Sequence, residues 1–198
     1  MPDLHIRLHK NILWLILNRD PLNPLTAEML GSLNGALRKA TGQAPHLIVI
    51  TGTGERAFCA GVDLPDDAEE HRAKLLREAR ETCALFEELR ACGIPTVALV
   101  KGSAYGAGCE LAALCDTVIA REDALFRLPS VNAKVFPSAT AIYLPAAIGQ
   151  ENTSRLMRSG ETLNAQEAMR LGLAHQVLST RRFLSDTEEL LVMLSTQS

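Results

Sequence analysis

Val97–Asp116 reads V-A-L-V-K-G-S-A-Y-G-A-G-C-E-L-A-A-L-C-D, and the rest of the chain is organised around this stretch. It begins with a short apolar strand, three glycines then break the pattern, and small helix-compatible residues follow from Cys109 to Cys115. A glycine loop between a strand and a helix directs unpaired backbone N–H groups into the space before the helix, where the helix dipole also favours negative charge. Such a loop can bind an anion, or a carbonyl oxygen on which negative charge develops.

Glu110 falls in the first turn of the helix predicted by this stretch. An acid or base at that position lies close to the charge that it would help to create. A structural interpretation is equally open, in which the glycines allow the helix to pack tightly on the strand and Glu110 interacts with the helix dipole.

The composition is that of one soluble domain spanning residues 1–198. A chain of 198 residues with 47% hydrophobic residues can form one core, and its net charge of −3 gives no electrostatic basis for binding nucleic acid or an anionic membrane. We expect a cytoplasmic protein, because the first residues, M-P-D-L-H-I-R-L-H-K, match no signal or transit pattern, and no apolar run reaches transmembrane length. The five cysteines form no C-x-x-C pair, which suits reduced thiols. His5 and His9 alternate with apolar residues on a predicted strand, so we expect no metal site there.

Another strand followed by a glycine loop lies earlier in the chain than Val97–Asp116. Its loop has the sequence T-G-T-G-E-R-A-F-C-A-G-V-D-L, at residues 51–64. Gly52, Gly54 and Ala57 match a dinucleotide-binding fingerprint, but the chain continues as a loop instead of the required helix, so we expect no NAD site. If the fold brings the two loops together, N–H groups from both can donate to one oxygen. Such an oxyanion hole is worth ~2.7–4 kcal/mol per donor.

The remaining pattern predicts short elements without a repeat or a domain linker. Strands are expected at 4–8, 12–17, 47–51, 97–100, 117–120 and 124–126, and helices at 26–39, 69–91, 137–148, 150–159, 164–172 and 185–194.

Taken together, the segments resemble the enoyl-CoA hydratase/isomerase superfamily, the crotonases. The matching segments are Asn18-Arg19 with Asn23, I-V-I-T-G-T-G-E-R-A-F-C-A-G-V-D-L, V-K-G-S-A-Y-G-A-G-C-E-L-A-A-L-C-D, D-A-L-F-R-L-P and E-A-M-R-L-G-L-A. The resemblance implies an α/β fold, the ββα spiral of the ClpP/crotonase type, assembled as a homotrimer or a dimer of trimers. Compared with the family pattern, which has additional C-terminal helices, the expected C-terminal helical region is shortened, with residues 1–178 forming the spiral core and 179–198 the remaining helix.

The resemblance further implies a site for an acyl-CoA thioester, with no metal and no cofactor beyond the CoA of the substrate. The N–H groups of Val62 and Ala107 correspond to the oxyanion donors, and Glu110 corresponds to a catalytic glutamate. Substrate and CoA contacts are expected at Ala60, Gly61, Asp63, Leu64, Gly106 and Ser130, and the walls of the acyl pocket at 69–91 and 130–144.

One departure from the family pattern affects the expected chemistry. The second glutamate of the hydratases follows the proline of the F-x-x-P segment, and Ser130 occupies this position. Hydration then requires Glu110 to act in both proton steps, or help from Asp123, Tyr105 or Tyr143. Hydration or isomerisation of an enoyl-CoA is the first expectation, and V-N-A-K-V-F-P-S-A-T-A-I-Y-L-P-A-A-I-G resembles the cyclic-dienoyl-CoA hydratases. The alternatives are an acyl-CoA hydrolase or decarboxylase, and a catalytically idle homologue that serves as a binding or partner subunit.

Overall fold

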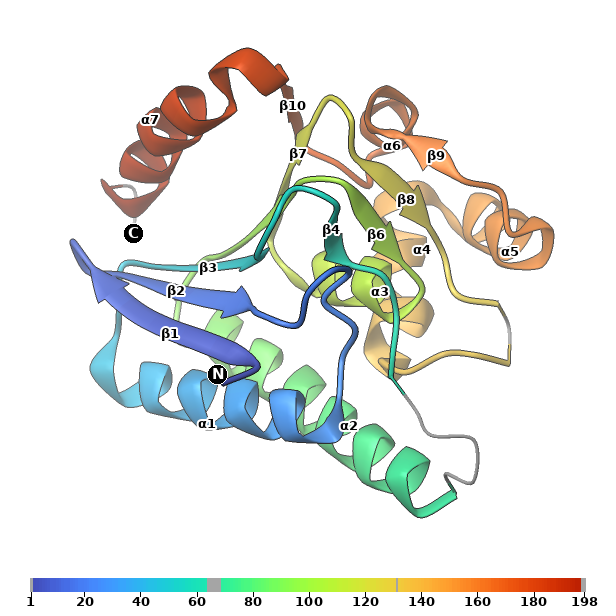
Figure 1. Cartoon of the computed structure of the whole chain (residues 1–198), viewed down its shortest axis with the longest axis horizontal. Coiled ribbons are helices and arrows are strands. Elements are labelled where there is room, and N and C mark those ends of the chain that lie inside the picture. Colours follow the sequence, from blue (N-terminus) through green and yellow to red (C-terminus); the bar gives the residue numbers. More distant parts are fainter. Residues whose placement is uncertain (1, 64–68, 131, 197–198) are drawn as a thin grey trace.

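Two sheets form the framework of the chain, which is described here by a computed structural model for residues 2–63, 69–130 and 132–196 (Figure 1). The larger sheet has the order β1-β2-β3-β5-β7-β10, and the smaller has the order β4-β6-β8-β9. The larger sheet contains β1 (Leu4–His9), β2 (Ile12–Leu17), β3 (Leu47–Gly52), β5 (Thr96–Val100), β7 (Thr117–Arg121) and β10 (Gln176–Leu178). The smaller contains β4 (Ala57–Cys59), β6 (Ser103–Tyr105), β8 (Leu125–Arg127) and β9 (Leu163–Asn164). The predicted α/β class is confirmed.

Each turn of the chain adds one strand to each sheet and then a helix. β3 and β4 are followed by α2 (Glu69–Ala91), and β5 and β6 are followed by α3 (Ala107–Leu114). β7 and β8 lead to α4 (Leu144–Ile148) and α5 (Gln150–Ser159), and β9 leads to α6 (Ala165–Leu171). Strands from successive turns pair in parallel within each sheet, as in β3 with β5, β5 with β7, β4 with β6 and β6 with β8. This arrangement is the ββα spiral that the resemblance implies.

The central strands of the larger sheet, such as β3 and β5, are buried on both faces. Ile48 and Ile50 of β3 belong to the core beneath α1 (Ala27–Gln43) and α2, whereas Leu47 and Val49 belong to a smaller cluster with Leu191 of α7 (Phe183–Thr196). Figure 1 shows α1 and α2 on one side of this sheet and α7 on the other. Because successive strand residues point to opposite faces, a strand covered on both sides is apolar throughout, which explains the L-I-V-I run.

Two short strands were not predicted. β4 and β6 lie in stretches predicted as loops, because strands of three residues with adjacent glycines show too little of an alternating pattern. The helix predicted at 137–148 is confirmed, and it contains a π-helical turn at Ala139–Tyr143, in which the Leu144 N–H donates to the Ala139 carbonyl. Pro145 has no N–H for an α-helical bond, which accounts for the irregular turn.

The helix predicted at 185–194 starts earlier, at Phe183. A 3-10 turn at Thr180–Arg182 leads directly into α7, and the Ser185 hydroxyl donates to the Arg182 carbonyl 3.0 Å away. The helix predicted at 164–172 is confirmed as α6, and Asn164 and Glu167 form a reciprocal capping box at its start.

Candidate active site

The two glycine loops lie side by side because the strands that precede them are paired. β4 and β6 are parallel, with Ala57 opposite Ser103 and Cys59 opposite Ala104. Gly108, in the first turn of α3, lies so close to β4 that a Cβ atom at this position would overlap the carbonyl oxygen of Cys59. The start of α3 therefore packs directly on the backbone of the other loop.

The N–H of Val62 points away from Leu25, the residue to which its segment is bridged. Its neighbours form a parallel bridge to Leu25, in which the Leu25 N–H donates to the Gly61 carbonyl and the Asp63 N–H donates to the Leu25 carbonyl, both at 2.9 Å. In a parallel bridge the central residue's own N–H points to the opposite side. The Val62 side chain packs against the main core, which fixes this orientation.

Ala107 is the first residue of α3, so helical bonding leaves its N–H free. The preceding Gly106 has φ 53° and ψ −117°, a conformation that other residues rarely adopt. Gly106 is held on both sides, since its N–H donates to the Arg127 carbonyl at 2.9 Å and its carbonyl accepts from the Glu110 N–H at 3.0 Å. The turn thus points the Ala107 N–H out of the helix start.

Glu110 has no exposed surface. Its carboxylate accepts hydrogen bonds from the backbone N–H groups of Val135, at 3.0 Å, and Phe136, at 3.3 Å. Burial raises the pKa of Glu110 to about 8, against the opposing effects of these two hydrogen bonds and of the Lys134 charge. A carboxyl group that is mostly protonated at neutral pH, beside free N–H donors, is the type of group that carries protons in enzymes.

The remaining predicted contact residues surround the first loop or lie beyond β8. The Ala60 N–H donates to the Leu22 carbonyl at 2.9 Å, and Asp63 is exposed and forms an ion pair with Arg19. Leu64 lies outside the described residues. Ser130 is exposed after β8, and its carbonyl accepts from the Ala133 N–H at 2.9 Å.

The three residues considered as helpers for Glu110 each have a partner of another kind. Asp123 binds Arg121 at 2.6 Å, which holds the pKa of Asp123 below its usual range. The Arg127 guanidinium lies 4.9 Å from the centre of the Tyr105 ring. Tyr143 is hydrogen-bonded to Arg90 and to Glu87, and its pKa is raised to about 12, chiefly by burial.

The sequence did not reveal the partners of Glu110, because Val135 and Phe136 use backbone groups, which any residue type except proline supplies. It also did not reveal the role of Asn23, which is fully buried. The Asn23 amide donates to the carbonyls of Thr53, at 3.0 Å, and Ala57, at 2.9 Å, and so ties the turn before α1 to the loop before β4. An asparagine between prolines in a turn was the available signal.

The described ranges contain neither a metal-binding cluster nor a helix that could span a membrane. Residues 2–63, 69–130 and 132–196 contain no group of three or more His, Cys, Asp or Glu side chains arranged to hold a metal ion. Within the same ranges, the helices are all too short or too polar to cross a membrane.

Comparison with known proteins places this geometry in a family. A family model described as enoyl-CoA hydratase/isomerase matches residues 7–198. The chain is 37% identical over 183 residues to 2,3-dehydroadipyl-CoA hydratase of Escherichia coli, covering 89% of this chain and 69% of the relative. It is 31% identical to carnitinyl-CoA dehydratase of Proteus mirabilis, covering 95% of this chain and 72% of that relative.

Solved structures agree with these relatives. DspI of Pseudomonas aeruginosa superposes with a TM-score of 0.87 at 27% identity, covering 100% of this chain and 76% of that one. An enoyl-CoA hydratase/isomerase family protein of Silicibacter pomeroyi superposes with a TM-score of 0.83 at 33% identity, covering 97% of this chain and 83% of that one. The expected crotonase fold is therefore confirmed, and the chain belongs to the enoyl-CoA hydratase/isomerase family.

Proposed function

We propose that the chain hydrates an enoyl-CoA thioester, or dehydrates the corresponding 3-hydroxyacyl-CoA, with Glu110 as its acid and base. The observation that carries this proposal is a fully buried carboxyl group, with a pKa of about 8, in the first turn of a helix that starts at the second glycine loop. Hydratases among the relatives support the choice of reaction.

The two loops would hold the thioester carbonyl. Its oxygen would accept from the N–H groups of Val62 and Ala107, and these donors would stabilise the enolate that forms when the β-carbon is attacked. One such donor is worth ~2.7–4 kcal/mol in a well-studied enzyme. The backbone of Ala60–Leu64 would bind the adenine end of CoA.

Glu110 would serve both proton steps in turn. Its carboxylate takes a proton from water as the oxygen bonds to the β-carbon, and the same carboxyl then gives a proton to the α-carbon of the enolate. One proton is taken and one is returned, so a single carboxyl balances the reaction. Since Glu110 has no exposed surface, the layer that covers it must move before a substrate reaches it.

This cycle starts from ionised Glu110, which sets its pH dependence. With a pKa of about 8, about one tenth of the molecules are ionised at pH 7. We expect kcat/KM to rise about tenfold per pH unit below pH 8 and to level off above it. A kcat/KM that is constant from pH 6 to 9 would contradict the cycle.

The exposed Ser130 favours one second candidate, double-bond isomerisation, which moves a single proton from one carbon to another and needs no second carboxylate. The test is loss of conjugated-thioester absorbance with a linear enoyl-CoA and a cyclic dienoyl-CoA, together with detection of the hydroxyacyl product. Conversion of a 3-enoyl-CoA to the conjugated 2-enoyl-CoA, without hydroxyacyl product, would select isomerisation.

Glu110→Gln should abolish turnover in either case while thioester binding persists. Unchanged turnover would exclude Glu110 as the proton carrier. Release of free CoA, or of CO₂, by the wild-type chain would instead support the hydrolase or decarboxylase. No reaction with any thioester, together with co-purification of a longer homologue, would support an idle partner subunit.

We also propose that the chain assembles as a homotrimer or a dimer of trimers, as its family resemblance implies. Light scattering coupled to size-exclusion chromatography measures the mass directly, and a monomer at micromolar concentration would refute this assembly.

A further inference from the structure

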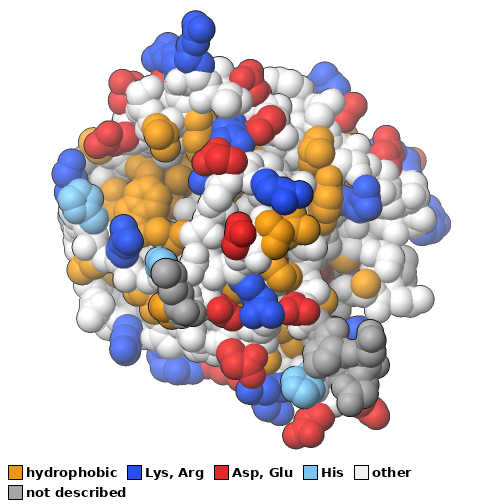
Figure 2. All heavy atoms as spheres, in the orientation of Figure 1, with side chains coloured by type: hydrophobic (Ala, Val, Ile, Leu, Met, Phe, Trp, Pro, Cys, Tyr) orange, Lys and Arg blue, Asp and Glu red, His pale blue; other side chains and the backbone are white. Residues whose placement is uncertain are grey.

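An apolar cavity of about 480 Å³ lies on the side of the larger sheet opposite to α1 and α2, between the sheet and α7. Its wall is mainly apolar and comes from β2, β5 and α7, including Ile12, Trp14, Ile16, Leu99, Phe183 and Leu191. Figure 2 shows hydrophobic side chains gathered in a hollow between α7 and the β1–β2 edge. The volume lies within the range of about 300–1,000 Å³ that is typical of small-molecule sites.

The cavity is separate from the candidate active site. Leu99 of β5 lies in the cluster beneath α7, whereas Cys109 and Leu111, on either side of Glu110, lie in the core beneath α1 and α2. The sheet separates the two regions, so a molecule bound beneath α7 would not overlap a thioester at Glu110. The inference therefore does not rest on the proposed function.

A buried hydroxyl in the cavity wall lacks a hydrogen-bond partner. Thr187 of α7 is 6% exposed, and within the described residues nothing bonds to its Oγ1. The other threonines of the wall are satisfied, since the Thr51 hydroxyl donates to the Leu99 carbonyl and the Thr53 hydroxyl donates to Asn23. The Thr187 Oγ1 has less than 1 Å² of accessible surface, so it faces away from the cavity, and these three threonines offer no free hydroxyl to a ligand.

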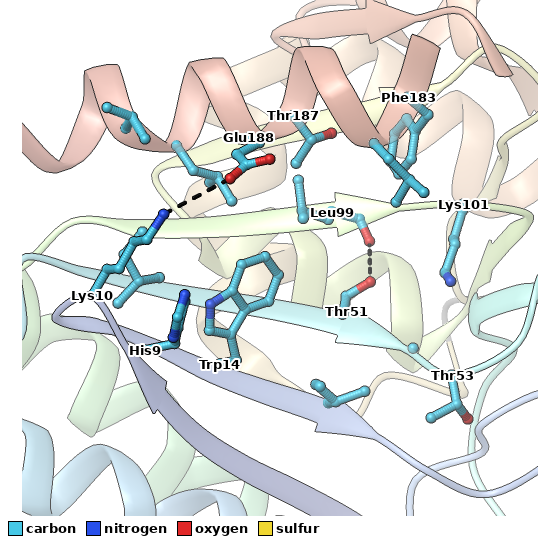
Figure 3. A pocket seen from close by; sticks show the side chains of 16 residues that line it. His9, Lys10, Trp14, Thr51, Thr53, Leu99, Lys101, Phe183, Thr187 and Glu188 are labelled. Atoms are coloured by element: carbon cyan, nitrogen blue, oxygen red, sulfur yellow. Dashed lines mark hydrogen bonds and ion pairs between the residues drawn. The ribbon is translucent and has the colours of Figure 1, made fainter. Parts of the chain in front are cut away.

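A cation lies in the same wall. The Lys101 side chain is 20% exposed, and its Nζ lies 3.3 Å from Glu55, a residue whose side chain is 70% exposed and also pairs with Arg121. Figure 3 shows Lys101 and Phe183 towards one end of the cavity, His9, Lys10 and Trp14 towards the other, and Thr187 between them. An ion pair with such an exposed carboxylate contributes little to stability, so Lys101 can exchange Glu55 for another anion at little cost.

We propose that this cavity binds a medium-chain carboxylate, with its hydrocarbon chain along Ile12, Trp14 and Leu191 and its carboxylate at Lys101. The apolar wall accommodates the chain, and the half-buried ammonium attracts the carboxylate. Among the charged side chains that line the cavity, Lys10 pairs with the exposed Glu188 at 4.0 Å, whereas Glu55, the partner of Lys101, is not part of the lining.

Trp14 gives a direct readout, because it is the single tryptophan of the chain and lines the cavity. Titration with decanoate should change its fluorescence saturably, and 1-decanol, which has the same chain without the charge, should bind about tenfold more weakly. The same titration of Glu110→Gln should be unchanged, which separates this site from the thioester site.

One variant tests the polar end. Lys101→Met should weaken decanoate binding about tenfold and leave 1-decanol unaffected. Lys10→Met is the matched control, because Lys10 is exposed and lies towards the other end, and its titration should match wild type.

Three results would overturn the proposal. The first is no saturable change at Trp14 with millimolar decanoate. The second is equal binding of decanoate and 1-decanol, or an unaltered titration in a folded Lys101→Met variant. The third is a Trp14 signal that depends on protein concentration and not on decanoate, which would show that a second copy of the chain fills the cavity.

Discussion

Replacing Glu110 by glutamine should make the protein more stable at neutral and alkaline pH. The pKa of Glu110 is raised from 4.5 to about 8 by burial, so between these pH values the folded chain holds a proton that the unfolded chain has released. Stability therefore falls as pH rises through this window, by about 1.4 kcal/mol per pH unit. Below pH 4.5 both states are protonated and this loss is absent. Above pH 8 it is complete.

The size of the effect follows from the width of the window. Between pH 4.5 and pH 8 the raised pKa lowers the free energy of unfolding by about 5 kcal/mol in total, and about 3 kcal/mol of this decrease has occurred by pH 7. Glutamine is neutral at every pH and avoids this loss, while its carbonyl can still accept from Val135 or Phe136. The advantage of Glu110→Gln over wild type should therefore increase steadily from pH 5 to pH 8.

The assay is urea denaturation of both proteins at pH 5, 6, 7, 8 and 9. The change in the stability difference with pH is the quantity of interest, because it cancels any constant cost of the substitution. Glu28→Gln is the control of opposite sign, since a hydrogen bond from Lys74 lowers the pKa of the exposed Glu28. Removing the Glu28 carboxylate should lower the free energy of unfolding by less than about 1 kcal/mol above pH 4.5. A wild-type to Glu110→Gln difference that stays constant across pH would refute the raised pKa, and with it the argument for Glu110 as a proton carrier.

Three further substitutions test the loops and the expected second acid. Gly108→Ala should lower the free energy of unfolding, measured by urea denaturation, by about 2–3 kcal/mol, because the added methyl group overlaps Cys59. The control is Gly35→Ala, in the middle of α1 with free space around it, which should raise the free energy of unfolding by about 0.5–1 kcal/mol. Equal effects of the two substitutions would contradict the close packing at Gly108. Asn23→Ala should lower the free energy of unfolding by about 2–3 kcal/mol, because two buried carbonyls lose their hydrogen-bond donor. A decrease below about 0.5 kcal/mol would show that Asn23 does not hold the two segments together. Ser130→Glu should raise the rate of enoyl-CoA hydration at least about tenfold, and an unchanged rate would show that position 130 lies away from the substrate.

The sequence predicted those features that residue types encode. Apolar runs bounded by glycines marked β3 and β5, and the glycines followed by small residues marked the start of α3 with Glu110 in its first turn. These patterns lie within single segments, so they can be recognised without knowledge of the fold. The proximity of the two loops, in contrast, was expected from the resemblance and not from any one segment.

Other features depend on contacts between distant segments and have no local pattern. The burial of Glu110 results from Val135 and Phe136 closing over it, and their sequence does not indicate which carboxyl their N–H groups meet. Trp14 lies in a continuous apolar run, as is typical of a buried strand, yet it remains partly exposed, because α7 covers the sheet incompletely and leaves a cavity. Side-chain packing of this kind is set by the whole structure, not by periodicity.

The parallel pairing of β4 with β6 has an evolutionary consequence. Both proposed donors are backbone groups. The packing of Gly108 on Cys59 and the β4–β6 ladder hold the start of α3 with Ala107, and the bridge to Leu25 holds Val62, so neither donor needs a side chain from the expected acyl-pocket walls. The expected acyl-pocket walls are residues 69–91 and 130–144, and their described residues lie outside the ladder, so selection can alter them while the donors stay in place. Mutational libraries aimed at new acyl specificities should therefore vary residues 69–91 and 130–144 and keep residues 57–62 and 103–108 constant.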